Sequence, residues 1–469
     1  MTENQEDKNN TAKSTQGVKT LLSTPEKAIR KLSGPMIIAM SVQTLYNIID
    51  SIWVAGLGSD KLAAIGLFFP VFMIIISLAS GISIGGSSAI SRKIGAKDKQ
   101  AADSAAGHTL FMGAAAAIFI LIFILPFLKT FFIALGAEIS VAELIAAYGK
   151  IIVGGSAILI FNNIAGGILR GEGDTKRVMY AMSLGSVLNI ILDPLFIYTF
   201  KMGINGAAWA TLTSMSFTAA LNFYWLFIKK NTYTTFKLKT LKLNKKITSE
   251  ILKVGIPASL AQMSMALAIF IINYFIVISA GTNGVAVFTG AWRIIMIGLV
   301  PLLGISAGVT AVTGAAFGAR NIKKLKTGYF YGIKIGIITE ILITTFIIIL
   351  SPQLTYLFTH SGNTAHISEI MQKTLIQLAL FLPFVPAGMF TSSMFQGIGK
   401  GEYSLAITIM RTLVFQILFV WLFGIKADFG LSGISAGIVT GNITASLIAF
   451  VWGQLTIKKL KINYQKPKN

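Results

Sequence analysis

Residues Gly34 to Gly58 read GPMIIAMSVQTLYNIIDSIWVAGLG, an apolar run long enough to cross a lipid bilayer. Asp50 lies well inside this run. A charge near the bilayer centre costs about 2.5 to 3.5 kcal/mol on insertion scales, so an acidic residue there indicates a functional site. Alternatively, Asp50 ends its helix and reaches the lipid headgroups. The apolar residues that follow Asp50 favour the first interpretation.

Three polar side chains accompany Asp50. Gln43, Asn47 and Asp50 recur at spacings of three and four residues, which places them on one face of a helix. Tyr46 lies between them in the sequence. We expect Gln43, Tyr46 and Asn47 to line a hydrated cavity that contains Asp50.

The composition is that of an all-α polytopic membrane protein. Hydrophobic residues make up 54% of the 469 residues and charged residues only 12%. About twelve apolar segments each exceed the roughly 20 residues that a membrane-spanning helix needs. The chain has no cysteine, which excludes disulfides and thiolate metal sites. It also has no G-x-x-x-x-G-K-[ST] motif, so ATP hydrolysis is not expected to supply its energy.

The basic residues predict the orientation in the membrane. The chain carries 40 Lys and Arg against 18 Asp and Glu, a net charge of +22 that suggests nucleic-acid binding in a soluble protein. Here the basic residues lie in alternate loops between apolar segments, which the positive-inside rule assigns to the cytoplasm. We therefore expect a multi-pass plasma-membrane protein with both termini in the cytoplasm and no nucleic-acid partner.

An internal repeat divides the chain into two halves. KLSGP at Lys31 matches KVGIP at Lys253, and GISIGG at Gly81 matches GISAGV at Gly304. Two further pairs follow at the same offset of about 222 to 227 residues, which predicts two parallel, pseudo-symmetric lobes of six helices. The predicted organisation is a disordered cytoplasmic tail (1–22), an N-terminal lobe (23–229), a basic cytoplasmic linker (230–250), a C-terminal lobe (251–458) and a basic cytoplasmic tail (459–469).

A second intramembrane carboxylate occurs in the same half. Asp193 follows Asn189 by one helical turn and directly precedes Pro194. It is also consistent with a helix end at which the proline acts as a stop signal. The repeat positions of Asp50 and Asp193 in the second half are apolar, so we expect the ion chemistry in the N-terminal lobe.

Two coupling ions fit these residues. Paired carboxyl groups in a buried site can exchange protons. Alternatively, Asp50, Asn189, Asp193 and the Thr211 hydroxyl supply hard oxygen ligands that suit Na⁺. The sequence leaves both ions open, and no other cofactor is expected.

Other charged residues are weaker candidates. Arg293, Glu340 and Arg411 lie inside predicted spans of the second half, where pairing with each other is favoured over cavity lining or an interfacial position. The three histidines are scattered and predict no metal site. Pro35 and Pro194 are predicted helix-bending positions.

Several runs resemble the multidrug and toxic compound extrusion (MATE) family, in its DinF-type branch as found in archaea. The resemblance rests on MSVQTLYNIIDSIWVAGLG, LAAIGLFFPVF, FNNIAGGILRGEGDTKR and LNIILDPLFIYTF in the first half, and on VAVFTGAWRI, VTGAAFGARN and MFQGIGKGE in the second. It covers about Pro25 to Lys458. It implies twelve helices in two lobes that form a V around a central cavity.

The resemblance also implies a function. Members are antiporters, not enzymes, that export amphipathic and often cationic compounds by alternating access, driven by inward flow of H⁺ or Na⁺. In the DinF-type branch the coupling site maps onto Asp50, Asn189, Asp193 and Thr211, with Tyr46, Tyr148 and Asn163 nearby. We expect a monomer whose partners are small organic substrates and bilayer lipids. The alternative is a flippase for lipid-linked oligosaccharides or lipids, which shares the wider fold superfamily. A flippase predicts a strongly cationic cavity, and the acidic pair argues against that.

Overall fold

The computed structural model describes residues 15–134, 136, 138–236, 244–359 and 367–465. Helices make up nearly all of these residues, and no strand occurs among them. The helices of the first half are α2 (Gln16–Leu21), α3 (Pro25–Ala55), α4 (Ser59–Gly95), α5 (Lys99–Phe123), α6 (Leu128–Ala134), α7 (Ile139–Gly154), α8 (Ser156–Gly171), α9 (Thr175–Pro194) and α10 (Gly203–Phe223). Those of the second half are α11 (Lys245–Gly298), α12 (Val300–Gly318), α13 (Ile322–Ile349), α14 (Ser351–Thr359), α15 (Ser368–Ala379), α16 (Val385–Gly397), α17 (Gly401–Ile409), α18 (Gln416–Val420) and α19 (Gly430–Gln465).

The number of membrane-spanning helices among the described residues is close to the predicted twelve. Ten helices among the described residues are long and apolar enough to cross a bilayer, and the bent pair α7 and α8 makes an eleventh span. Helix α10 has 21 residues and packs against α9, at the place in the sequence where the sixth span is predicted. The 54 residues of α11 are two helices, because Gly281 has a non-helical backbone with φ of 61°.

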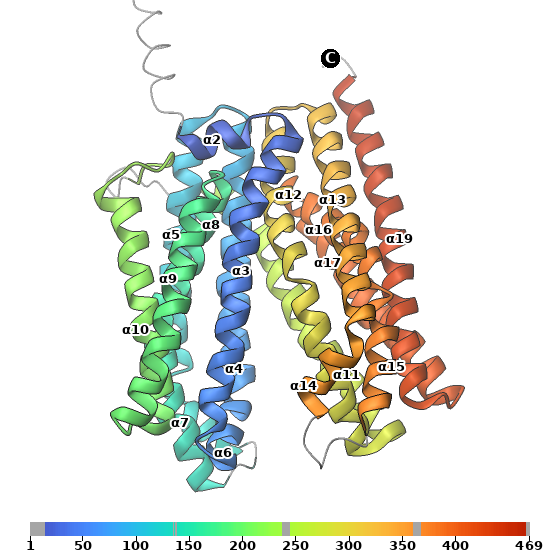
Figure 1. The fold of residues 1–469 in the computed structure, drawn as a ribbon. Coiled ribbons are helices and arrows are strands. Elements are labelled where there is room, and N and C mark those ends of the chain that lie inside the picture. The colour runs from blue at the N-terminus through green and yellow to red at the C-terminus, as the bar shows by residue number, and fades with distance from the viewer. Residues whose placement is uncertain (1–14, 135, 137, 237–243, 360–366, 466–469) are drawn as a thin grey trace, which may run out of the picture.

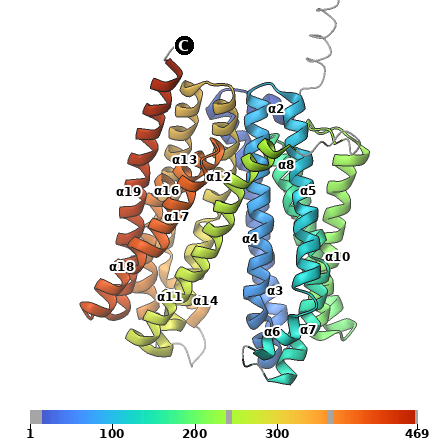
Figure 2. The same cartoon turned by 180° about the vertical axis from the view of Figure 1, so that it is seen from behind.

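The two halves form two lobes. Figures 1 and 2 show α3 to α10 on one side and α11 to α19 on the other. Backbone positions with positive φ recur in both halves at the spacing of the sequence repeat. They include Lys97 with Arg320, Gly173 with Gly399, and Gly203 with Gly430. The repeat therefore extends from the sequence to the turns that connect the helices.

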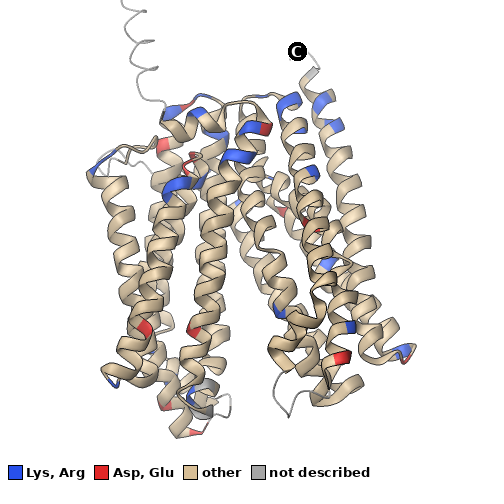
Figure 3. Ribbon diagram, viewed as in Figure 1, with Lys and Arg blue, Asp and Glu red and all other residues tan. Residues whose placement is uncertain are grey.

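The lobes meet at one end of the molecule. Most Lys and Arg residues gather at the end that carries α2 and the last turns of α19, which we call the basic end (Figure 3). There the helices approach closely, because Gly81 faces the backbone of Gly255, and Gly95 faces that of Ala315. The Ser88 hydroxyl donates to the Gln396 carbonyl across the same boundary. Toward the opposite end the ribbons of the two lobes diverge (Figure 1).

Three predicted boundaries need correction. The tail prediction for residues 1–22 is wrong for Gln16–Leu21, which form α2 with the Thr15 side chain as its N-cap; residues 1–14 lie outside the described part of the chain. The predicted linker extends to residue 250, but α11 begins at Lys245. The predicted C-terminal tail begins at residue 459, but α19 continues to Gln465. Favourable capping and continued helical packing extend these helices beyond their apolar segments.

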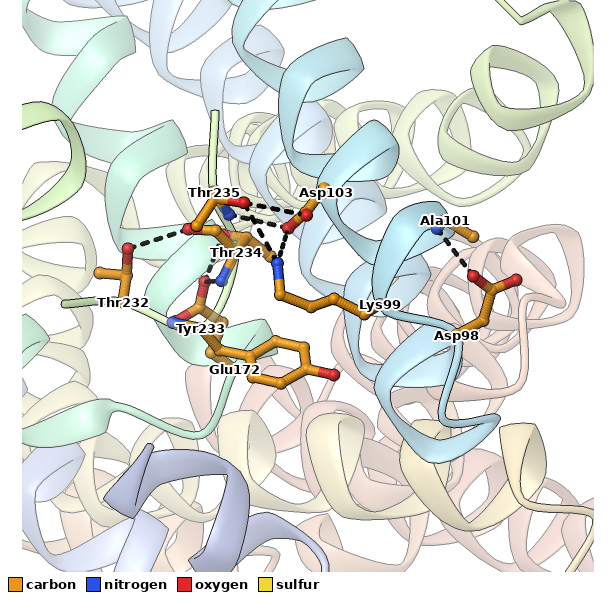
Figure 4. A network of polar contacts seen from close by, with 9 residues as sticks. All are labelled: Asp98, Lys99, Ala101, Asp103, Glu172, Thr232, Tyr233, Thr234 and Thr235. Atoms are coloured by element: carbon orange, nitrogen blue, oxygen red, sulfur yellow. Dashed lines mark hydrogen bonds and ion pairs between the residues drawn. The ribbon is translucent and has the colours of Figure 1, made fainter. Parts of the chain in front are cut away.

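The first part of the segment between the lobes is attached to the N-terminal lobe (Figure 4). Glu172, at the end of α8, is fully buried and accepts backbone hydrogen bonds from Tyr233 and Thr234, each of 2.8 Å. The Thr234 hydroxyl also donates to it. One residue further on, Thr235 donates its backbone N–H to Asp103 of α5 at 2.7 Å. Two carboxylates from different helices thus hold residues 233–235.

Residue 244 is attached to the same lobe. The backbone N–H of Asn244 donates to His108 Nε2 at 2.7 Å, and His108 Nδ1 lies 2.7 Å from the Ser104 carbonyl. This pattern assigns the imidazole proton to Nδ1, because Nε2 must accept. His108 therefore has a structural role at the start of α11.

The attachment to Glu172 is predicted to depend on pH. Burial raises the pKa of Glu172 to about 7, although hydrogen bonds from Thr234 and Tyr233 oppose this rise. An exposed glutamate has a pKa of about 4.3, so protonation of Glu172 favours the attached form. Attachment should be tightest at a pH below the pKa of an exposed glutamate. As the pH rises from there toward 7, the equilibrium constant for attachment should fall by up to about tenfold per pH unit, and above 7 it should change little. Hydrogen exchange of residues 232–235 measures this opening.

The matched variant is Glu172→Gln, which cannot titrate. We expect its opening equilibrium to be independent of pH. The opening equilibrium is obtained by dividing the exchange rate by the base-catalysed intrinsic rate at each pH. An opening equilibrium that falls as the pH rises, or one that keeps the pH dependence of the natural chain in Glu172→Gln, would contradict the assignment.

The close approach of the lobes at Gly95 gives a second prediction. A Cβ at Gly95 lies 1.9 Å from the Ala315 carbonyl oxygen, a distance that real Cβ atoms do not adopt. Gly95→Ala should therefore separate α4 from α12 and open the basic end. Because the chain has no cysteine, labels on cysteines introduced at the exposed residues Gln100 and Lys323 report that distance.

Gly66→Ala is the control in the same helix, because a Cβ there has no atom within 4 Å. It should leave the label distance unchanged. Equal distances in Gly95→Ala and Gly66→Ala would show that this contact does not hold the lobes together.

Candidate cation-coupling site

Two carboxylates from different helices lie together in the N-terminal lobe. Asp50 comes from α3 and Asp193 from the last turn of α9, and these helices pack along each other. Their carboxyl groups interact directly. Asp193 has no exposed surface, and Asn189 Nδ2 donates to its Oδ1 at 3.0 Å. Asp50 and Asp193 are 143 positions apart in the sequence, and the structure brings them together within one lobe.

Side chains from two more helices complete this cluster. Tyr46, one turn before Asp50 on α3, interacts with both carboxyl groups and lies within hydrogen-bonding reach of the Thr211 side chain from α10. Tyr148 of α7 approaches the same two carboxyl groups. Four helices of one lobe thus supply carboxyl, amide and hydroxyl oxygens to a single buried place.

Two buried oxygens of the cluster lack a partner. Asn189 Oδ1 and Asp193 Oδ2 have no hydrogen bond within the described part of the protein. A buried polar atom left unpaired costs about 1 to 3 kcal/mol. A proton shared between the carboxyl groups, or a cation bound by their oxygens, would remove this cost. The cluster is therefore suited to bind a small cation.

The backbone changes at this place. Helix α9 ends at Pro194, and residues Leu195–Thr199 continue as a π-helix. π-Helical turns are often found at functional sites. However, Trp421–Lys426 form a π-helix near the corresponding place of the second half, where no acid occurs. The π-helical turn is therefore a feature of both halves. At this place, only the side chains of Asp193 and Asn189 distinguish the first half from the second.

A contact beyond the predicted residues holds the site together. The Tyr198 hydroxyl, within the π-helix, donates to the Trp53 carbonyl at the end of α3 at 2.7 Å, and the two rings pack edge to face. This bond ties together the two helices that carry the acids. Tyr198 directly follows the LDPLFI run in the sequence. A tyrosine near a helix end has many common roles, so its position in the sequence did not predict this contact with Trp53.

Three other predicted residues form no hydrogen bond with the acid pair among the described residues. Gln43 and Asn47 are exposed on α3, and no contact with either carboxylate is found among the described residues. Asn163 of α8 donates to the Leu159 carbonyl at 3.1 Å, and its own carbonyl accepts from Ser83. Asn163 therefore supports the packing of α8 against α4. A cavity-lining role for Gln43, Asn47 and Asn163 stays a prediction.

The predicted pairing of charges in the second half is wrong. No ion pair among the described residues joins Arg293, Glu340 and Arg411. Arg293 is exposed, whereas Glu340 is fully buried with both carboxyl oxygens unpaired within the described residues. These residues lie on three separate helical segments. All three lie inside predicted spans, but that does not bring their side chains into contact.

A two-lobed bundle of membrane-spanning helices with a pair of acids in contact inside one lobe defines a multi-pass membrane transporter. The comparisons with known proteins identify which kind. Residues 35–195 and 257–422 match the model of the MatE family. The two matched stretches are the two halves of the repeat, and the chain belongs to this family of MATE transporters.

Relatives and solved structures agree with this assignment. The chain is 27% identical to the multidrug export protein MepA of Staphylococcus aureus (strain MSSA476) over 439 residues, which cover 93% of this chain and 95% of that protein. A crystal structure of MATE in complex with MaL6 is 50% identical, with a TM-score of 0.94 over 95% of this chain and 99% of that one. A MOP superfamily transporter from Pyrococcus furiosus is 49% identical, with a TM-score of 0.92 over 95% of this chain and 99% of that one. These similarities confirm the predicted family and the two-lobe fold; the DinF-type branch stays a prediction.

Proposed function

We propose that this protein exports amphipathic, often cationic organic compounds in exchange for inward flow of H⁺ or Na⁺. The observation that carries the proposal is the contact between the fully buried Asp193 and the half-buried Asp50, with unpaired oxygens on Asn189 and Asp193. Acids at membrane depth that face the protein interior are typical of ion pathways and proton relays. The similarity to a multidrug export protein supports the substrate class.

The arrangement of the lobes supports alternating access. The positive-inside rule assigns the basic end to the cytoplasm. The lobes are in contact at that end and diverge at the other, as expected for a transporter that is open to the outside (Figures 1 and 2). Similar proteins have been crystallised in a straight and in a bent conformation. Rocking of one lobe against the other is therefore the movement that we propose.

Exchange requires that cation and substrate disfavour each other. A cation bound at the acid pair neutralises the charge that attracts a cationic substrate to the N-terminal lobe. By linkage, the substrate must weaken cation binding by the same factor. The driving cation thus enters as the substrate leaves.

Two prolines are suited to transmit this change. Helix α3 runs continuously through Pro35, which cannot donate a backbone hydrogen bond and so weakens the helix at that turn. Pro194 directly follows Asp193 at the end of α9. We propose that neutralisation of the acids changes the bend of both helices.

The acid pair is tested with Asp50→Asn and Asp193→Asn in proteoliposomes. Either change removes one titratable group and one cation ligand while keeping the shape of the side chain. We expect exchange of a cationic dye, driven by a proton or sodium gradient, to fall by about tenfold or more, because each carboxylate in a buried pair contributes at least about 1.4 kcal/mol.

Asp428→Asn is the control, since Asp428 is an exposed acid outside the spans in the αL conformation, which asparagine adopts readily. It should transport normally. Gradient-driven exchange that survives in both Asp50→Asn and Asp193→Asn would refute the proposal.

A second variant distinguishes the ions. Thr211→Val keeps the shape of the side chain but removes a hydroxyl oxygen near Tyr46. A sodium ion needs several oxygen ligands, whereas a proton needs only the carboxyl pair. We expect sodium-driven exchange to fall by about tenfold, equivalent to about 1.4 kcal/mol, and proton-driven exchange to change by less than about twofold.

Thr213→Val, two residues along the same helix, controls for loss of a hydroxyl from α10. A larger effect of Thr211→Val on proton-driven than on sodium-driven exchange would contradict the assignment of Thr211 as a cation ligand.

A further inference from the structure

A cavity of about 360 Å³ lies between the lobes at the basic end. The N-terminal lobe contributes the last turn of α4, and the C-terminal lobe contributes the start of α11 and the ends of α12, α16 and α19. Its charged lining residues are Arg92, Lys93, Lys253, Arg320 and Glu250. Four cationic side chains therefore surround one carboxylate, far from the acid pair of the transport site.

Glu250 neutralises only part of this charge. Its carboxylate lies 3.1 Å from Lys93 Nζ and 3.8 Å from Arg92 Nη2, so it links the two lobes. Lys253 and Arg320 are exposed and form no ion pair within the described ranges. The cavity therefore holds more cationic side chains than Glu250 can balance, and its lining contains no second carboxylate among the described residues.

Arg92 gives this cavity a fixed hydrogen-bonding wall. Its side chain is only 10% exposed. Its Nη1 donates to Ser88 Oγ and to the Gly397 carbonyl, which orients the guanidinium from both lobes. A guanidinium has five N–H donors, so several remain for a ligand, and their fork geometry suits phosphate oxygens.

The surroundings match an amphipathic ligand. Phe317 and Tyr464 pack edge to face in the wall of the cavity. A second cavity, of about 310 Å³, is lined by Tyr403, Trp452 and Leu455 together with Lys400 and Lys459. Tyrosine and tryptophan are typical of the level of the lipid headgroups. Both cavities at the basic end thus combine cationic and aromatic side chains.

We propose that this cavity binds a phosphoryl anion, the headgroup of an anionic phospholipid. Basic pockets between membrane-spanning helices on the cytoplasmic side are known to accept such headgroups. Because both lobes build the cavity, the ligand binds best while the basic end is closed. By mass action it stabilises that conformation.

The test compares vesicles of phosphatidylcholine alone with vesicles that also contain phosphatidylglycerol. Labels on cysteines introduced at Gln100 and Lys323 report whether the basic end is closed. We expect phosphatidylglycerol to raise the closed-to-open ratio by about tenfold when its concentration is about ten times its dissociation constant. In native mass spectrometry the detergent-solubilised protein should retain phosphatidylglycerol.

The test variant is Lys253→Gln with Arg320→Gln, which removes the two unpaired cations and leaves the pair of Glu250 with Lys93 intact. It should abolish both the shift and the retained lipid. The control is Lys245→Gln with Lys246→Gln, which removes the same charge from exposed residues of α11 outside the cavity. The control should behave as the natural chain does.

Two further arms separate the outcomes. If inorganic phosphate added to phosphatidylcholine vesicles produces the same shift, the site is confirmed for phosphoryl anions and its ligand is soluble. Equal lipid retention and equal shifts in both double variants would overturn the proposal, because they would show only general attraction to a charged membrane. Lipid retention is measured without transport, so it tests the proposed lipid site separately from the proposed antiport.

Discussion

The structure depends on the contact between two acidic side chains in one lobe of a membrane protein, of which Asp193 is fully buried and Asp50 half-buried. Asp193 has no exposed surface, and it faces Asp50 across the contact between α3 and α9. Two negative charges in direct contact in a medium of low dielectric constant are strongly unfavourable unless a positive charge joins them. The site is therefore stable when it holds a cation or a shared proton, and a transport cycle can draw energy from that preference.

The fold places this site away from the contact between the lobes. Tyr46, Tyr148 and Thr211 join the acids from within the N-terminal lobe, whereas Gly81, Gly95 and Arg92 contact the C-terminal lobe near the basic end. Neutralisation of the acids must therefore act on the lobes through the helices themselves. Helix α3 is suited to this role, since it carries Asp50 and also packs against α12 of the other lobe.

Much of the fold was predictable from the sequence, because apolar length and the internal repeat are strong signals. The two acids were also predictable, since a carboxylate inside an apolar run is costly and therefore informative. The exposure of Gln43 and Asn47 could not be predicted, because a shared helical spacing does not determine which residues of a helix pack against the neighbouring helix. Nor could Glu172, Asp103 and their hold on residues 233–235 be predicted, because they depend on loop contacts between distant segments. The absence of pairing between Arg293, Glu340 and Arg411 could not be predicted either, because it depends on how separate helical segments pack against each other.

The central claim is that the pair Asp50 and Asp193 binds the coupling cation and releases it when substrate binds. Infrared difference spectroscopy of protein with isotope-labelled aspartate tests this most directly, because it observes the carboxyl groups themselves. Addition of a cationic substrate should change the carboxyl bands in the natural chain, in a way that depends on pH or sodium, and Asp193→Asn should lack the change. Carboxyl bands in the natural chain that stay the same while substrate binds would contradict the account.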